Sequence, residues 1–363
     1  MLASILIITL LLAAANGAND NIKGAATLFG SGVANYRTAI TLATLATAAG
    51  GLASIYVAHG LLVAFSGKGI VPQDIATSIP FLGSVGLAAA VTVGIATRLG
   101  MPISTTHALL GGLSGAGFAA VASNVHLDIA FKEMLLPLLF SPVIALVLAL
   151  AVVPLVRRIR TRTANAKACA CIDVPATVVG ETLAATRATL TFGTMDQPTC
   201  APTAGRQVIA VDSARFADHV HLASAAAVSF ARGLNDTPKI AALSAATGML
   251  GASSATTLAV IAMAVGGYLA ARRVADTMAF RITRMDVGQG LGANLVTSLL
   301  VIGASRFGMP VSTTHVASGA LFGVAASGHG GHRAVIRNVV LAWLLTLPVA
   351  AVCAYLIYLL LTR

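Results

Sequence analysis

Two short polar motifs occur twice in this chain, and this repetition constrains its fold more than any other feature. Residues 98–107 read RLGMPISTTH and residues 306–315 read RFGMPVSTTH, which are identical at eight of ten positions. The motif that comes first in each half is NGANDNIK at residues 16–23, which returns as RGLNDTPK at residues 232–239, so the STTH stretch is the second motif of each half. The same two motifs therefore follow in the same order in two halves, which predicts a polar site that is built twice.

The sequence around these motifs is too apolar for a soluble globular protein. Hydrophobic residues make up 57% of the chain, charged residues make up 10%, and the mean hydropathy is +0.89. Long runs of Ala, Val, Leu, Ile and Gly are typical of membrane-spanning segments. Few aromatic residues and 35 glycines favour closely packed helices over a barrel of strands. We therefore expect an all-α polytopic protein that crosses a bacterial-type cell (inner) membrane several times.

The basic balance of the chain, +11 in formal charge, does not indicate a nucleic-acid partner. Lys and Arg stand at the ends of apolar runs and form no face with interleaved aromatic residues, so the excess is a topology signal. Cys169, Cys171 and Cys200 have no histidine beside them at zinc-ligand spacing. This pattern predicts unpaired thiols, no metal centre at the cysteines and no cofactor.

Apolar spans predict the membrane crossings of each half: residues 2–34, 38–65, 79–97 and 134–156, then 219–249, 253–271, 291–305 and 335–361. We expect the first helix to break at Gly17–Asp20, because Gly, Asn and Asp are poor helix formers. Its twin carries Gly233–Pro238 at its centre, where proline favours a break.

Each STTH stretch lies between the third and the last span of its half. Proline followed by Ser and Thr is typical of a helix start, so a helix is expected right after Arg98 and Arg306, as one arm of a re-entrant hairpin. If the stretch turns back, each half has four crossings and the halves are parallel; if it crosses, each half has five and the halves are inverted. We favour two inverted-topology repeats with broken helices and re-entrant hairpins, because inversion places two copies of a motif face to face near the midplane.

Residues 157–218 form the one long polar stretch, so we expect a linker between a first transmembrane repeat (1–156) and a second (219–363). The stretch opens with RRIRTR directly after an apolar span. Its four arginines predict that this end lies in the cytoplasm.

Asp20 and Asp236 are carboxylates inside apolar runs, where an ionised group needs a partner or a wet cavity. Two interpretations stay open: a cation or proton site, which the duplication favours, and ion pairs with Lys23 and Lys239, one helical turn further on. Both can hold together, because a nearby lysine keeps an aspartate charged. Asparagine amides and freed carbonyls would complete the oxygen shell that Na⁺ prefers. The candidate cation-binding residues are Asn19, Asp20, Asn235 and Asp236.

Three consecutive hydroxyl side chains follow each proline. Hydroxyl groups and backbone N–H groups at the start of a helix suit a tetrahedral oxyanion, whereas a single such triplet would indicate ordinary capping. His107 and His315 close the motif as candidate proton carriers or anion ligands, or as histidines bonded to a neighbouring backbone. The candidate anion-binding residues are Ser104, Thr105, Thr106, Ser312, Thr313 and Thr314.

The paired motifs resemble those of the inorganic phosphate transporter (PiT) family of secondary carriers, across both hydrophobic halves. The G-x-N-D motif of that family is matched by GAND at 17–20 and GLND at 233–236, and its P-x-S-x-T-H motif by PISTTH and PVSTTH. The resemblance implies an inverted-repeat fold, frequently a homodimer, that couples phosphate entry to Na⁺ or H⁺. It also implies that Ser104–Thr106 and Ser312–Thr314 hold phosphate while the Asn-Asp pairs hold the coupling cation.

The first motif departs from the family, because it continues as NIK where many members have an Ala-Asn pair. Coupling to protons and transport of a metal–phosphate complex therefore stay open. A sulfate permease of the same family is the alternative; however, a carboxylate accepts a hydrogen bond from protonated phosphate and repels sulfate, so Asp20 and Asp236 favour phosphate.

A membrane-embedded hydrolase is disfavoured, because the sequence has no nucleophile elbow, no HExxH and no acidic cluster. We predict a phosphate symporter that works by alternating access and is not an enzyme.

Overall fold

The computed structural model describes residues 2–163, 168–173, 176–179, 182–185, 189–194, 206–211, 213–328 and 330–363. Both hydrophobic halves are helical, as expected. The first half contains α1 (Leu2–Asp20), α2 (Ala26–Gly30), α3 (Tyr36–Val57), α4 (His59–Ala64), α5 (Gln73–Ala76), α6 (Ile79–Arg98), α7 (Thr105–Val121), α8 (Leu127–Ile129) and α9 (Leu136–Thr163). The second half contains α10 (Ser213–Ala245), α11 (Ala252–Ala270), α12 (Arg272–Asp276), α13 (Val287–Arg306), α14 (Thr313–Ser327) and α15 (Arg333–Leu361). Short 3₁₀ or π turns are η1 (Asn21–Gly24), η2 (Ala122–Asn124), η3 (Ala130–Leu135) and η5 (Thr277–Arg281).

Within the described residues, seven helical segments are long and apolar enough to cross a membrane. They make the chain a multi-pass integral membrane protein. These segments are Ala3–Gly24, Tyr36–Val57, Ile79–Arg98, Ala130–Thr161, Ala252–Ala270, Val287–Arg306 and Arg333–Leu361.

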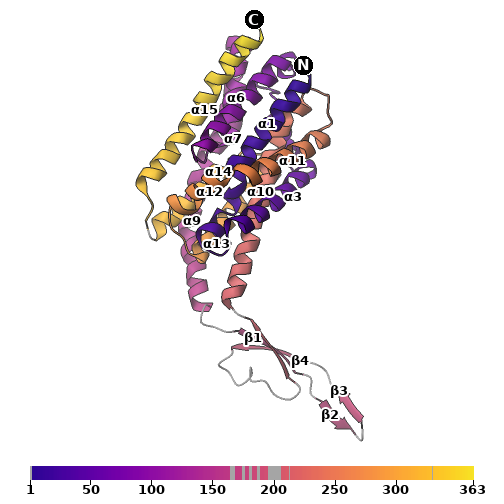
Figure 1. Ribbon diagram of the computed structural model, residues 1–363, viewed down its shortest axis with the longest axis vertical. Coiled ribbons are helices and arrows are strands. Elements are labelled where there is room, and N and C mark those ends of the chain that lie inside the picture. The colour runs from indigo at the N-terminus through magenta and orange to yellow at the C-terminus, as the bar shows by residue number, and fades with distance from the viewer. Residues whose placement is uncertain are drawn as a thin grey trace.

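Contacts between the halves occur in matched pairs. Helix α1 packs against α11 and its repeat counterpart α10 packs against α3, while α7 packs against α15 and its counterpart α14 packs against α9. These contacts are preserved when the two halves are exchanged. Both chain termini lie at one end of the helical body, and α9 and α10 extend from the other end (Figure 1).

The glycines repeated in the GAND and GLND motifs serve helix packing. A Cβ on Gly17 would lie 2.0 Å from the carbonyl oxygen of Met263, and a Cβ on Gly233 would lie 2.0 Å from that of Thr47. Small residues let helices in a membrane approach this closely. The glycines therefore mark the crossings of α1 with α11 and of α10 with α3.

The first helix breaks directly after the expected Gly17–Asp20 stretch, and its twin does not break. Helix α1 ends at Asp20 and passes into η1, but α10 continues from Ser213 to Ala245 through Pro238. The prediction of a break at Gly233–Pro238 is therefore wrong. Proline removes only one backbone donor, and packing against α3, α11 and α13 supports α10 on several sides.

The R-x-G-M-P stretches form helix ends followed by extended backbone. Gly100 has a φ of 69° and Gly308 a φ of 67°, the left-handed conformation of a C-terminal helix cap. Each cap is closed by a bond from the next methionine N–H, to the Ala96 and Ala304 carbonyls respectively, at 2.9 Å. The following helices begin seven residues after the arginines, at Thr105 and Thr313, rather than directly after them as expected. The reason is that the cap and the proline both stop a helix.

Between α9 and α10 the described residues form short strands, which the sequence analysis did not predict for the linker. Strand β1 (Ala168–Asp173) pairs antiparallel with β4 (Thr189–Thr194) and β5 (Arg206–Val211), and β2 (Ala176–Val179) pairs with β3 (Thr182–Ala185). Thr, Val and Ile are frequent in these strands, and such residues favour β-structure. Helices α9 and α10 extend into both ends of the expected linker, and Cys200 lies outside the described residues.

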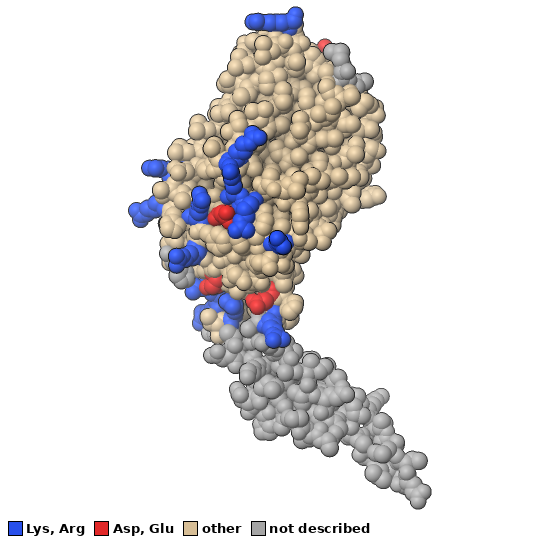
Figure 2. Space-filling view, in the orientation of Figure 1, with Lys and Arg blue, Asp and Glu red and all other residues tan. Residues whose placement is uncertain are grey.

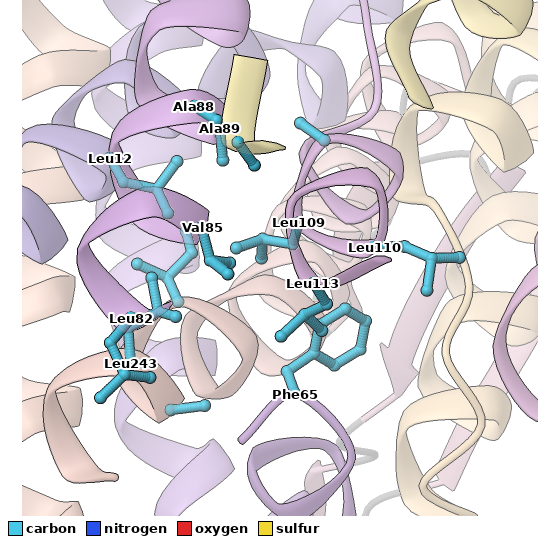
Figure 3. Packing of buried hydrophobic residues seen from close by; sticks show 14 of the residues in the cluster. Leu12, Phe65, Leu82, Val85, Ala88, Ala89, Leu109, Leu110, Leu113 and Leu243 are labelled. Carbon is cyan, nitrogen blue, oxygen red and sulfur yellow. The ribbon is translucent and has the colours of Figure 1, made fainter. Parts of the chain in front are cut away.

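A large apolar core packs beside the motif-bearing helices. Figure 3 shows Leu12 of α1, Val85 of α6, Leu109 and Leu113 of α7 and Phe65 with their side chains gathered together. All five are at most 2% exposed. This packing fixes α1, α6 and α7, and so positions the first copy of each motif.

Candidate functional site

The turn that follows α1 brings Lys23 back toward Asp20. Asp20 ends α1, and Lys23 lies in η1, three residues on. Their side chains are each 2% exposed and form an ion pair. A buried charge needs such a partner, because it has lost its hydration.

Lys23 binds three further oxygen atoms. Its Nζ donates to Oδ1 of Asn19 at 3.0 Å, to the carbonyl oxygen of Ile103 at 2.9 Å and to Oγ1 of Thr314 at 2.5 Å. Ile103 belongs to the PISTTH motif of the same half, and Thr314 belongs to the motif of the other half. The lysine therefore joins both copies of the second motif.

Lys239 repeats this arrangement in the second half. Its Nζ donates to the carbonyl oxygen of Val311 at 2.8 Å and to Oγ1 of Thr106 at 2.9 Å, and it lies 3.5 Å from Oδ1 of Asp236. The carbonyl and hydroxyl partners occupy the same motif positions as those of Lys23. Two equivalent lysine contacts therefore cross between the halves.

The serines of the two motifs are helix caps. Oγ of Ser104 accepts the backbone N–H of His107 at 3.1 Å, and Oγ of Ser312 accepts that of His315 at 3.2 Å. These bonds satisfy backbone donors that the start of a helix leaves free. The two serine hydroxyls therefore cap helices, which was one of the alternatives that the sequence left open.

The first threonine of each triplet faces the aspartate of its own half. Oγ1 of Thr105 lies 3.4 Å from Oδ2 of Asp20, and Oγ1 of Thr313 lies 3.1 Å from Oδ2 of Asp236. The second threonine contacts the lysine of the other half. Serine, first threonine and second threonine therefore have three different partners in each half.

The motif asparagines hold the extended segments in place. Nδ2 of Asn19 donates to Oγ1 of Thr97 and to the carbonyl oxygen of Met101, both at 3.0 Å. Nδ2 of Asn235 donates to the carbonyl oxygen of Val311 at 2.9 Å. Both asparagines are fully buried, so these bonds fix the extended backbone before α7 and α14 against α1 and α10.

Arg232 is a site residue that the sequence analysis missed. It is 1% exposed, and its guanidinium donates to the side chain and carbonyl of Asn16 and to Oδ1 of Asn21 at 2.9 Å, with Nε 3.7 Å from Asp236. The repeat offset could have identified it, because 232 − 16 = 216 equals the offset of the aspartates, 236 − 20 = 216. Asn16 and Arg232 thus hold equivalent positions and contact each other.

The charged cluster of the site carries a net positive charge. Lys23, Lys239 and Arg232 supply three positive charges, and Asp20 and Asp236 supply two negative charges. All five side chains are at most 4% exposed. In a low-dielectric interior, such an excess attracts an anion.

The two histidines lie against each other. The rings of His107 and His315 have centroids 4.4 Å apart, and the His315 ring also lies 4.2 Å from that of Trp343, tilted by 36°. Nδ1 of His107 lies 3.0 Å from Oγ of Ser104. The rings border a cavity of about 320 Å³ between α9 and α15. The structure therefore joins the histidines to the serine caps and not to the lysine contacts.

A buried, positively charged site, built from equivalent parts of two halves and enclosed by membrane-crossing helices, defines a multi-pass membrane transporter. The sequence profile of the phosphate transporter family matches residues 16–354. The chain therefore belongs to the phosphate transporter family.

Individual relatives agree with this membership. A protein of Rhizobium meliloti named as a low-affinity inorganic phosphate transporter is 29% identical over 84% of this chain and 80% of its own length. One of the same name from Mycobacterium tuberculosis is 28% identical over 92% of this chain and 71% of its own length. A protein of Pyrococcus abyssi named as a phosphate permease is 25% identical over 97% of this chain and 96% of its own length.

A solved structure, named as the sodium-dependent phosphate transporter, has the same fold. It aligns with a TM-score of 0.75 and 20% identity, over 99% of this chain and 98% of that chain. At this identity the likeness concerns the fold alone.

Proposed function

We propose that this chain carries inorganic phosphate across the cell (inner) membrane as a symporter, driven by a gradient of Na⁺ or H⁺ and working by alternating access. The observation that carries the proposal is the reciprocal contact of each lysine with the threonine of the other half. It places two ammonium groups at the starts of α7 and α14. Helix starts, hydroxyl donors and cations together suit a tetrahedral oxyanion.

Phosphate binding would exchange protein contacts for contacts with the anion. The hydroxyl groups of Thr106 and Thr314 now accept from lysines, and a phosphate between them would accept from both the hydroxyls and the ammonium groups. Arg232 would add long-range attraction. The full set proposed for phosphate is Ser104, Thr105, Thr106, Ser312, Thr313 and Thr314, with the serines acting through the helix starts that they cap.

Alternating access follows from the way in which the halves share the site. The cross-half bonds of Lys23 and Lys239 must change when the halves move relative to each other. We propose that the halves are inverted repeats, which is supported by α1 starting at the end of the body where α15 finishes, and α10 starting at the opposite end (Figure 1). Coupling would act at Asn19, Asp20, Asn235 and Asp236. The homodimer and the division at residues 157–218 stay predictions.

The proposed orientation places the segment between the halves in the cytoplasm. Figure 2 shows Lys and Arg gathered at the end of the helical body next to this segment, while most of the rest of this face carries other residues. Arg157 and Arg160 of α9 lie there, near Asp286 at 3.3 and 3.9 Å. An excess of basic residues marks the cytoplasmic side.

Competitive equilibrium binding tests the choice of phosphate over sulfate. Radiolabelled phosphate would be bound to purified protein in detergent and displaced with unlabelled phosphate or sulfate. We expect displacement by phosphate and at least about tenfold weaker displacement by sulfate, because the buried carboxylates accept a hydrogen bond only from a protonated anion. Equal displacement would move the protein to the sulfate permeases of its family.

A further inference from the structure

The two site lysines have surroundings that an alkali cation would accept as a binding site. Around Nζ of Lys23 lie a carboxylate oxygen of Asp20, an amide oxygen of Asn19, the carbonyl oxygen of Ile103 and the hydroxyl of Thr314. Hard oxygen ligands of these types, including carbonyls freed at a helix break, are those that hold Na⁺ in membrane transporters. In this chain a tethered ammonium group fills the shell.

In the second half, Lys239 occupies an equivalent set of oxygen atoms. Nζ of Lys239 is surrounded by the hydroxyl of Thr106, the carbonyl oxygen of Val311 and the carboxylate of Asp236. Each lysine is at most 3% exposed, so its charge is neutralised by these oxygens and not by water. Both copies of the motif place the lysine ammonium group against equivalent oxygens, so these contacts are not accidental.

A sodium ion has no place beside these ammonium groups. The three ammonium protons of Lys23 already face four oxygen atoms. These oxygens are therefore occupied by the lysine and do not offer a shell to a sodium ion. A second unit charge about 4 Å away would weaken cation binding by roughly a thousandfold, at the effective dielectric constant of a protein. The buried guanidinium of Arg232, which lies 3.7 Å from the Asp236 carboxylate, adds to this repulsion.

We propose that Lys23 and Lys239 are built-in cations that occupy the positions of coupling sodium ions, so that this chain binds and moves its anion without Na⁺. The proposal rests on the proposed phosphate transport. It also narrows the choice of coupling ion, because H⁺ is then the one that remains of the two considered. It also assigns the lysines a role with phosphate, since each offsets anion charge from a fixed position.

Replacing the lysines opens the shells. In a Lys23→Asn/Lys239→Asn variant, the carboxylates and carbonyls lose their tethered cation and gain a neutral amide. A small cation can then enter, because the buried aspartates still require a positive charge. Lys68→Asn is the matched control, because Lys68 is exposed and lies outside the site.

Binding of radioactive sodium to purified protein tests the proposal without any phosphate. The wild type and Lys68→Asn should bind no sodium above background at millimolar concentration, and the double variant should bind it. Saturable sodium binding by the wild type overturns the proposal, and so does a folded double variant that binds none. If the double variant is not monodisperse in size-exclusion chromatography, single Lys239→Asn replaces it, and the wild-type result stands in either case.

Transport in proteoliposomes separates this proposal from the function on which it rests. Initial phosphate uptake by the wild type should differ by less than about twofold between sodium and choline media of equal pH and ionic strength, because no site for Na⁺ is open. Uptake stimulated by sodium more than about tenfold contradicts the built-in cations while leaving phosphate transport intact. Absence of phosphate uptake in both media, with no sodium binding, contradicts the proposed function alone.

Discussion

Nζ of Lys239 donates a hydrogen bond to Oγ1 of Thr106 at 2.9 Å, across 133 residues of sequence. Its repeat counterpart joins Lys23 to Thr314 at 2.5 Å, across 291 residues. Each half thus supplies a cation to the hydroxyl of the other half. These two contacts hold the halves together at the site, and a bound anion would compete for both.

Removal of either cross-half hydroxyl should weaken phosphate binding. In Thr106→Val and Thr314→Val, the anion loses one donor, and hydrogen bonds to charged groups contribute about 1.5–3 kcal/mol, so we expect at least roughly tenfold weaker binding. Displacement of radiolabelled phosphate measures this. Thr257→Val is the control, since the hydroxyl of Thr257 donates to Ser253 within α11. Unchanged affinity in both site variants would exclude these threonines as ligands.

The Asp20–Lys23 pair should show strong coupling in a double-mutant cycle. Asp20→Asn or Lys23→Met alone leaves an unpaired buried charge, which costs about 3–5 kcal/mol in unfolding free energy. The double variant should cost less than the sum by more than about 1 kcal/mol. Unfolding of the purified protein in detergent by urea measures the four species.

A surface pair provides the control for this cycle. Arg272 and Asp276 lie 3.2 Å apart, with side chains 56% and 36% exposed. Their coupling should stay below about 1 kcal/mol. Equal coupling of the two pairs would mean that Asp20 and Lys23 are solvated in the folded protein.

The motif glycines should not tolerate a methyl group. Gly17→Ala and Gly233→Ala each place Cβ 2.0 Å from a backbone oxygen of the neighbouring helix, and overpacking of this kind costs about 1–3 kcal/mol. Gly94→Ala in α6 meets no atom within 4 Å and should leave stability equal or raised by about 0.5–1 kcal/mol. Thermal unfolding in detergent would compare the three, and the helix crossings would be in doubt if they behaved alike.

Arg232 should raise the affinity of the site for anions. Arg232→Gln removes the net positive charge, so the KM for phosphate uptake should rise at least about tenfold. Arg272→Gln, on the exposed pair, should leave KM unchanged. A change in KM of less than about twofold lies within the error of such a measurement. If Arg232→Gln changed KM by no more than that, Arg232 would only support Asn16 and Asn21.

The repeat made much of the fold and site predictable. Two copies of each motif indicated equivalent halves, and the spacing of Asp20 and Lys23 indicated an ion pair, which the structure contains. The spans lie close to observed helices because hydropathy is a strong local signal in membrane proteins. The motif hydroxyls and lysines are brought together, but which lysine meets which threonine was not predictable, because that contact depends on long-range packing.

Three other features of the structure could not be predicted from hydropathy. The path of α10 through Pro238 depends on packing from three neighbouring helices. The late starts of α7 and α14 depend on the left-handed Gly100 and Gly308. Arg232 was not predicted, because its repeat partner Asn16 is neutral and only positions with the same residue in both halves indicated a site.

Phosphate transport driven by protons and independent of sodium is best tested by uptake of radiolabelled phosphate into proteoliposomes. An inward proton gradient, an inward sodium gradient and no gradient would be imposed in parallel, with and without excess sulfate. We expect phosphate accumulation that follows the proton gradient, is unaffected by sodium and resists sulfate. Failure to accumulate phosphate under any gradient, or uptake that sulfate abolishes, would contradict it.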